Sequence, residues 1–212
     1  MEIDTNKAIK PFLSSSSQSS IHTVSYEDRS FYKGELVSSQ RNGKGFYISS
    51  SSQIYIGEWV NDKKEGFGKE FNTKNDLIYA GHWKKNKKEG EGIHFNIQSS
   101  EEEQKDANID YTVNQNKHMK EGNIKLSDHE QKDEGIEFVR KNPFVTSKIL
   151  SHWKKYEGEF VNDKKEGIGR LEYDDGTIFV GKFEEDEFVD GIINVDGEEI
   201  KVLFENNKLL EA

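Results

Sequence analysis

Cysteine is absent from the 212-residue chain, and proline occurs only twice. Without cysteine the sequence offers no disulfide framework, no cysteine-ligated zinc, no iron–sulfur cluster and no thiol nucleophile. Apolar residues make up 32% of the chain, whereas roughly half is usual. No apolar run approaches the roughly 20 residues that a membrane-spanning helix needs. We therefore expect neither a thick two-layer α/β core nor a transmembrane segment.

Positive charge is also in deficit, since the formal net charge is −10. That balance argues against general nucleic-acid binding, because a nucleic-acid surface is itself strongly negative. The first residues, Met1 to Asp4, open acidic and lead into a serine tract. This start matches neither a secretory signal nor a transit peptide, so we expect a cytoplasmic protein. Aromatic residues are plentiful at 11%, which is typical of a folded chain and favours a thin sheet with one face covered by rings.

An internal repeat dominates the sequence. Counted from a tyrosine, glycine recurs two, eleven and thirteen residues later, and a large apolar residue recurs four residues later. The four tyrosines are Tyr32, Tyr55, Tyr79 and Tyr156. The glycines two residues on are Gly34, Gly57, Gly81 and Gly158, and the large apolar residues are Leu36, Trp59, Trp83 and Phe160. The later glycines are Gly43, Gly66, Gly90 and Gly167, then Gly45, Gly68, Gly92 and Gly169.

Less regular copies flank these four. A fifth begins at Phe179 and carries Gly181 and Phe183, but its next glycine, Gly191, comes one residue late. Residues 21–31 look like the second half of a repeat, and Ile200, Val202 and Phe204 look like the first half of another. Atypical ends are expected, because terminal units must cap a stack. We also expect residues 202–212 to finish as a short helix.

Each repeat predicts a β-hairpin. In residues 55–59 the tyrosine, glycine and tryptophan share one face of a strand, because side chains alternate with a period of two. Asn61 and Asp62 suit a tight turn, and a return strand follows over about 65–71. Glycine weakens a strand, so its regular use needs a reason. We interpret Gly66 and Gly68 as bare backbone on which aromatic rings of adjacent strands lie.

These motifs, repeated at intervals of 23 and 24 residues, resemble the MORN (membrane occupation and recognition nexus) repeat. The resemblance covers about 21–95 and 153–204, and it implies an all-β protein: an elongated, single-layer antiparallel sheet of about 10–12 strands built from consecutive MORN hairpins. One departure is systematic. The glycine usual seven residues after the tyrosine is replaced by Ser39, Asp62, Asn86 and Asp163.

Five segments follow from this reading. We predict a serine-rich tail over 1–20, a half repeat plus three hairpins over 21–95, and an insertion of low regularity over 96–152. Two further hairpins and a degenerate cap occupy 153–204, and a C-terminal tail occupies 205–212. The insertion is either a loop peculiar to this protein or a docking arm for one partner.

Catalytic and metal-binding motifs are not indicated, so we expect no enzyme, no cofactor and no metal. The six histidines lack the spacing of a zinc helix, and we expect His82 and His94 at ordinary outward or edge positions of one repeat. The acidic turns at 174–177 and 196–197 lack a calcium-binding loop and read as hairpin turns. The Gly-x-Gly pairs lie within strands, whereas a phosphate-binding loop opens a helix.

Two surfaces are candidates for partner binding. The first is a ridge of paired lysines at the hairpin turns, which would contact acidic lipid headgroups or an acidic protein tail. Adjacent acidic residues make this ridge nearly neutral. Its lysines are Lys63, Lys64, Lys87, Lys88, Lys164 and Lys165. The aromatic face is either buried by its own curvature or forms a groove for a partner segment. Its residues are Tyr55, Trp59, Tyr79, Trp83, Tyr156, Phe160, Phe179 and Phe183.

The resemblance implies a non-enzymatic scaffold subunit that docks with other proteins in a large assembly. Similar proteins recur in ciliary axonemes, notably in radial-spoke heads, and in the cytoskeleton of protists, so we expect such a location. The alternative is a peripheral membrane module that binds anionic phospholipids through the lysines.

Overall fold

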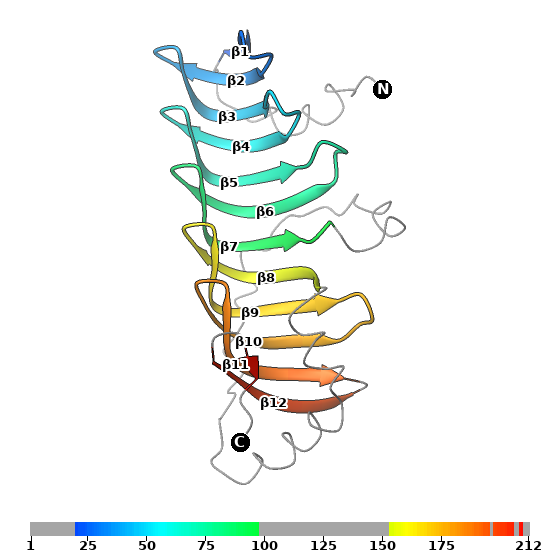
Figure 1. Ribbon diagram of the computed structural model, residues 1–212. Coiled ribbons are helices and arrows are strands. Elements are labelled where there is room, and N and C mark those ends of the chain that lie inside the picture. The colour runs from blue at the N-terminus through cyan, green and yellow to red at the C-terminus, as the bar shows by residue number, and fades with distance from the viewer. Residues whose placement is uncertain (1–19, 98–152, 196, 206–207, 210–212) are drawn as a thin grey trace.

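In the computed structural model the described residues are 20–97, 153–195, 197–205 and 208–209. They form one antiparallel sheet in which each strand pairs with its neighbours in the chain. Figure 1 shows the strands stacked in chain order, with β1 and β12 at opposite ends. The strands are β1 (Ile21–Ser25), β2 (Phe31–Val37), β3 (Gln40–Ile48), β4 (Ile54–Val60), β5 (Lys63–Phe71), β6 (Leu77–Lys84), β7 (Lys87–Phe95), β8 (Trp153–Val161), β9 (Lys164–Tyr173), β10 (Ile178–Glu184), β11 (Glu187–Val195), β12 (Glu198–Glu205) and β13 (Lys208–Leu209).

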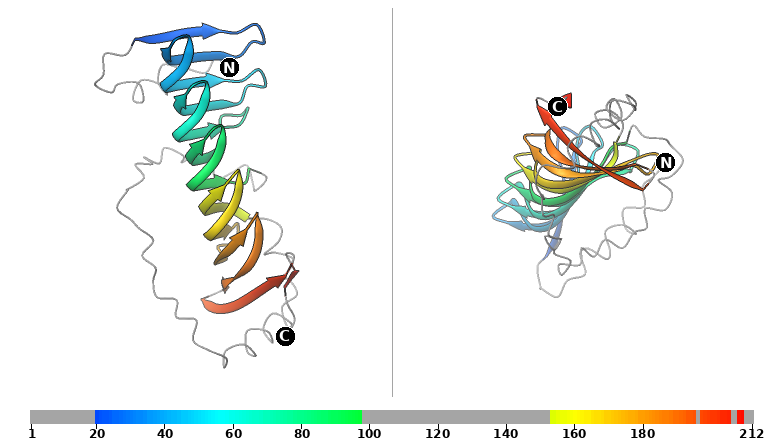
Figure 2. Two further views of the ribbon diagram at one scale, coloured as in Figure 1. Left: turned by 90° about the vertical axis from the view of Figure 1, so that its left-hand side faces the viewer. Right: turned by 90° about the horizontal axis from the view of Figure 1, so that it is seen from below.

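The predicted all-β fold, an open antiparallel sheet of consecutive hairpins, is confirmed. Figure 2 shows that the strands are curved and that the sheet twists along its length. Neither of its faces is covered by a second layer of described residues. No helix long and apolar enough for a membrane crossing occurs among the described residues. The predicted tail over 1–20 and the insertion over 96–152 lie almost wholly outside them.

The sheet continues across the predicted insertion. Strand β7 pairs with β8, with Gly92 opposite Gly158. The amide of Asn96 donates to the carbonyl oxygen of Lys154 at 3.0 Å, as Asn72 donates to Asp76 at the end of the preceding hairpin. The segment between β7 and β8 therefore leaves and rejoins the sheet at the edge that carries the other long loops. We call this the loop edge.

The opposite edge, the turn edge, carries two-residue hairpin turns. Both residues of each turn have positive φ, such as 51° at Asn162 and 73° at Asp163. Asparagine and aspartate tolerate this backbone better than most residues, and the turn's twist matches that of the strands. The other turns are Ser38–Ser39, Asn61–Asp62, Lys85–Asn86 and Glu185–Asp186.

The turns are also bonded to one another along this edge. The amide of Asp163 donates to the Lys88 carbonyl at 3.0 Å, and the Lys88 amide donates to Asp163 Oδ1 at 2.7 Å. The same reciprocal pair joins Asp62 to Arg41, Asn86 to Lys64 and Asp186 to Lys165. Aspartate or asparagine in place of the usual glycine thus adds a side-chain bond to the preceding hairpin.

A series of substitutions at Asp163 tests this reciprocal bond. We expect Asp163→Ala to lower the free energy of unfolding by about 2 kcal/mol, since it loses a hydrogen bond and places a Cβ at positive φ. Asp163→Gly should recover about 1 kcal/mol of that loss, because glycine accepts the backbone conformation. Asp163→Asn keeps the acceptor and should match the parent in urea denaturation. Equal stability of the alanine and asparagine variants would contradict the role of the side chain.

The end of the array differs from the sequence expectation. Residues 198–205 form the strand β12, so the predicted helix over 202–212 is wrong for its described part. Ile200, Val202 and Phe204 alternate along β12 and are 4–7% exposed. Their period-two burial against the last aromatic residues stabilises a strand there. Residues 206–207 and 210–212 lie outside the described part.

Candidate functional site

One face of the sheet, which we call the ring face, is built on a row of glycines. Gly57 and Gly68 lie opposite each other on β4 and β5, and the Tyr55 ring lies over both. A Cβ added to Gly57 would lie 2.7 Å from the Gly68 Cα, and one added to Gly68 would lie 2.5 Å from Tyr55 Cζ. Glycine is therefore required by close approach at these positions. The row crosses ten strands: Gly34, Gly45, Gly57, Gly68, Gly81, Gly92, Gly158, Gly169, Gly181 and Gly191.

The glycine eleven residues after each tyrosine has a different role from the one predicted. Gly66 does not seat a ring, because its φ is +59° and an added Cβ would meet the Glu58 carboxylate. It lies where the β4–β5 register shifts after Gly57, so it serves a bulge. In the fifth repeat Gly191 pairs with Gly181 and belongs to the glycine row. That repeat therefore lacks the bulge glycine and keeps the ring-seating one.

Aromatic rings form a continuous column over the glycine row. Tyr55, Tyr79 and Tyr156 each contact the large aromatic residue of their own repeat and that of the next repeat, edge to face. Tyr32, whose own repeat has Leu36 at that position, contacts Trp59 of the next repeat. Tyr55 lies 5.1 Å from Trp59 and 5.4 Å from Trp83, measured between ring centroids. The column passes from β6 to β8 through Tyr79 and Phe160, which are 5.3 Å apart. Such pairs add about 0.5–1.5 kcal/mol each beyond burial.

Each tyrosine hydroxyl is also bonded inside the ring face. The Tyr55 hydroxyl donates to the Glu58 carbonyl at 3.1 Å, and the other three repeats have the same bond. Burial raises the pKa of Tyr55 above its ordinary value. The phenols therefore stay neutral and serve as anchors rather than acid–base groups.

The eight aromatic residues predicted to line a partner groove lie in the core. Their exposure is only 0–5%, because each ring is covered by its neighbours in the column and by the residues described next. A partner on the ring face would thus meet the residues above these rings first. That the face binds a partner stays a prediction. The eight aromatic residues are Tyr55, Trp59, Tyr79, Trp83, Tyr156, Phe160, Phe179 and Phe183.

A second column, which sequence reasoning missed, lies on the rings. The residue nine after each tyrosine is cationic, and its charge lies over aromatic rings. Lys64 Nζ is 4.3 Å from the Trp83 centroid and 4.7 Å from that of Tyr55. Cation–π attraction favours this placement. We call Arg41, Lys64, Lys88 and Lys165 the cation column. In the fifth repeat Phe188 takes this position and packs 5.1 Å from Phe179.

The predicted lysine ridge is divided between the two faces of the sheet. Lys64, Lys88 and Lys165 belong to the cation column and are partly buried. The lysines that precede them in the chain are exposed on the other face, which we call the back face, because strand side chains alternate. Lys164 there pairs with Glu185 at 2.9 Å. The exposed members of the predicted ridge are Lys63, Lys87 and Lys164.

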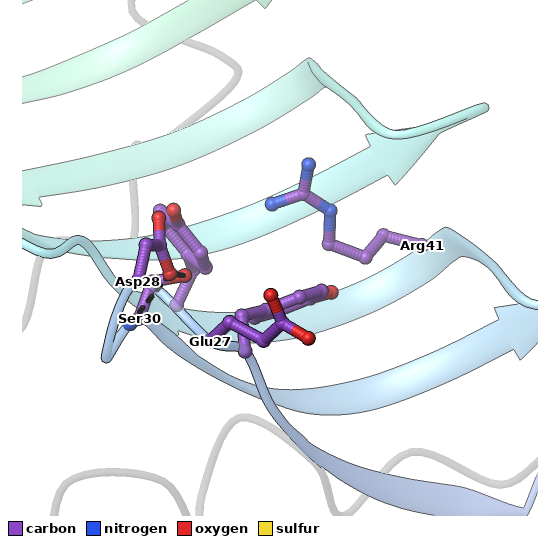
Figure 3. Close-up of a pocket in the computed structure, with 6 residues that line it drawn as sticks. Glu27, Asp28, Ser30 and Arg41 are labelled. Carbon is purple, nitrogen blue, oxygen red and sulfur yellow. Dashed lines mark hydrogen bonds between the residues drawn. The ribbon is translucent and has the colours of Figure 1, made fainter.

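Ion pairs hold most of the cation column. Arg41 Nε lies 3.0 Å from Asp62 Oδ1, and Lys64 Nζ lies 2.6 Å from Glu70 Oε1. At the β1 end of the ring face Arg41 also borders an open pocket of about 450 Å³. Figure 3 shows Glu27 and Arg41 in that pocket, while Asp28 accepts hydrogen bonds from Ser30. No group of three or more potential metal ligands gathers in the described part of the chain.

His94 lies among the rings, contrary to its prediction as an ordinary outward or edge residue. It faces Tyr79 across β6 and β7, and its ring centroid is 5.3 Å from that of Trp153. Burial first, and then Lys88 and Lys165, lower the pKa of His94 to about 3.

This shift predicts a pH dependence. Below the ordinary pKa of 6.5 the unfolded chain binds a proton at this residue, whereas the folded chain stays neutral until about pH 3. The free energy of unfolding should therefore fall from pH 6.5 towards 3 more steeply for the parent than for His94→Gln. Parallel pH profiles in urea denaturation would contradict the buried, neutral histidine.

Comparison with known families agrees with this geometry. No curated protein matches the chain significantly. Four stretches match the family model of the MORN repeat, namely residues 32–53, 55–75, 79–94 and 156–178. The matched stretches supply most of β2 to β9, eight of the ten glycines of the row, and the ring column from Tyr32 to Phe160. These four matches support a MORN repeat protein whose repeats suggest a module for protein or membrane interaction.

Proposed function

We propose that the chain is a non-enzymatic scaffold subunit that docks in a larger protein assembly. The observation that carries this proposal is the continuity of the ring column and the glycine row across the segment between β7 and β8. A docking arm or loop can leave the loop edge there while the sheet on either side keeps one shape. The twelve strands β1 to β12, at about 4.8 Å each, give a spacer of roughly 55 Å.

We place this assembly in the ciliary axoneme, as in a radial spoke, or elsewhere in the cytoskeleton. Support for this placement is the resemblance to small MORN proteins of such structures. Imaging of the tagged chain in its native cells, followed by extraction of membranes with detergent, tests it. The chain should remain with the cytoskeletal fraction. Quantitative release with the membranes would contradict the placement.

Purification of the tagged full chain from its native cells tests the scaffold role. We expect it to elute with fixed stoichiometry in a complex much larger than itself. A variant with a broken ring column, Phe160→Ala, should lose that complex, whereas Phe160→Trp should keep it. Elution of the parent as a free monomer under gentle extraction would count against the proposal.

Phospholipid binding is the alternative outcome. The exposed lysines Lys63, Lys87 and Lys164 are the groups that a flat anionic surface could reach. The test is flotation of the chain with phosphatidic acid or phosphoinositide vesicles at physiological salt. Flotation that is lost when these three lysines are replaced by glutamine would favour a membrane module over a scaffold. The net charge of −10 disfavours that result.

A further inference from the structure

The second and third repeats differ at one partly buried position of the ring face. In the second repeat Glu70 faces Tyr55 across the strands and pairs with Lys64, and both side chains are 19% exposed. In the third repeat the residue that faces Tyr79 is His94. The register therefore puts a histidine where the repeat before it has the carboxylate that balances the lysine.

Lys88 is the cation left without that carboxylate. Its Nζ lies 4.9 Å from the Tyr79 centroid and 6.0 Å from that of Phe160. Within the described part of the chain it has no ion-pair partner inside 4.0 Å, whereas the three other members of the cation column each have one. Burial lowers the pKa of Lys88, and Lys64 adds to the effect; Glu70, Asp163 and Asp186 oppose it from longer range.

The carboxylates of Glu70, Asp163 and Asp186 act on Lys88 from beyond ion-pair distance, and the two groups described next carry no negative charge. His94 is neutral, and it lies between the rings of Trp153 and Phe160. Lys165 Nζ is 4.7 Å from the Trp153 centroid, and its side chain is 14% exposed. Its ion pair with Asp186 is long, at 3.9 Å. We call Lys88, His94 and Lys165 the junction cluster, because they lie where β7, β8 and β9 meet.

We propose that the junction cluster binds the carboxylate of an aspartate or glutamate carried by an acidic segment of a protein partner on the ring face. This inference rests on the proposed scaffold function, since it names the chemistry of the docked partner. A half-buried ammonium group gains most from a charge-assisted hydrogen bond that returns a negative charge to it. The Lys64–Glu70 pair shows the same face holding such a carboxylate from within.

A protein side chain suits the site better than a lipid headgroup. The ammonium groups of the junction cluster lie low among aromatic rings, where a single side chain can reach them. A planar membrane surface would instead meet the exposed lysines of the back face. Binding of inorganic phosphate or of a phospholipid headgroup, in preference to a carboxylate, is therefore a competing outcome of the test.

Titration of the full chain with the peptide acetyl-(Glu)6-amide, followed by NMR of the Trp153 indole, provides that test. We expect saturable shifts that the glutamine analogue acetyl-(Gln)6-amide does not produce. Lys88→Met should weaken binding at least ten-fold. The matched control is Lys87→Met, which removes the same charge from the back face and should bind as the parent does.

A second variant supplies the carboxylate from within. His94→Glu recreates the lysine–glutamate pair of the second repeat, so it should raise the melting temperature and abolish peptide binding. Unchanged binding in Lys88→Met, a lower melting temperature in His94→Glu, or preference for inorganic phosphate or phosphatidic acid vesicles would overturn the proposal. The purification test of the scaffold role detects a complex formed through any face of the sheet. The scaffold proposal and the carboxylate-binding proposal can therefore fail separately.

Discussion

Replacing Phe160 with alanine is expected to divide the unfolding of this chain into two transitions. Phe160 is 1% exposed and lies between Tyr79 and Tyr156, at 5.3 and 5.2 Å. In the ring column it links the repeats before the 96–152 segment to those after it. Removing a buried phenylalanine costs about 3–5 kcal/mol. In a repeat protein a weakened interface uncouples its two sides.

Calorimetry and urea denaturation followed by fluorescence measure this effect. The parent should unfold in one transition and Phe160→Ala in two. The free energy of unfolding in the first of these two transitions should be about 3–5 kcal/mol lower than that of the parent. Phe160→Trp is the matched control, because tryptophan occupies this position in the two preceding repeats. There the Trp83 indole donates to the Gly68 carbonyl at 3.2 Å. A single, unshifted transition in the alanine variant would contradict the linking role of this ring.

Gly68→Val is expected to destabilise the sheet by on the order of 3 kcal/mol. The added side chain would occupy the space of the Tyr55 ring, which is 1% exposed and held between Trp59 and Trp83. Tyr55 cannot move without breaking its hydroxyl bond to Glu58 and its contacts in the column. The melting temperature should fall accordingly.

The control for this substitution is Glu91→Val, at an exposed strand position where the added apolar side chain meets no ring. It should change the free energy of unfolding by no more than about 0.5 kcal/mol. If Gly68→Val melted at the temperature of the parent, the glycine row would not be needed to seat the rings.

The fold could be predicted because its physical determinants are local and repeated. Tyr55 and Gly57 share a face by strand alternation, and the recurring interval fixes which glycines lie opposite each other. Distance along the chain does not interfere, since Gly92 and Gly158 pair in the same register. The role of Gly66 could not be derived in this way, because a bulge changes the face on which later residues lie.

The candidate site was less predictable. Lys63 and Lys64 are adjacent in sequence, yet alternation sends one to solvent and the other over Tyr55 and Trp83. The alternation of side chains between the two faces of a strand, which was used for the rings, also predicts this division of the turn lysines. His94 was missed because its surroundings come from β8 and β9, which lie more than 50 residues later in the chain. The helix predicted over 202–212 is wrong for its described part, because the period-two alternation of Ile200, Val202 and Phe204 continues the strand pattern of the repeats.

Cysteine cross-linking tests most directly whether the sheet is continuous across the 96–152 segment. The natural chain has no cysteine, so Glu91→Cys with Glu159→Cys creates a single possible pair. These residues are exposed and lie opposite each other on β7 and β8. Mild oxidation of the folded monomer should give an intramolecular disulfide nearly quantitatively, whereas Glu91→Cys with Glu184→Cys, three strands apart, should give none. Equal cross-linking of both pairs, or of neither, would show that β7 and β8 are not neighbours.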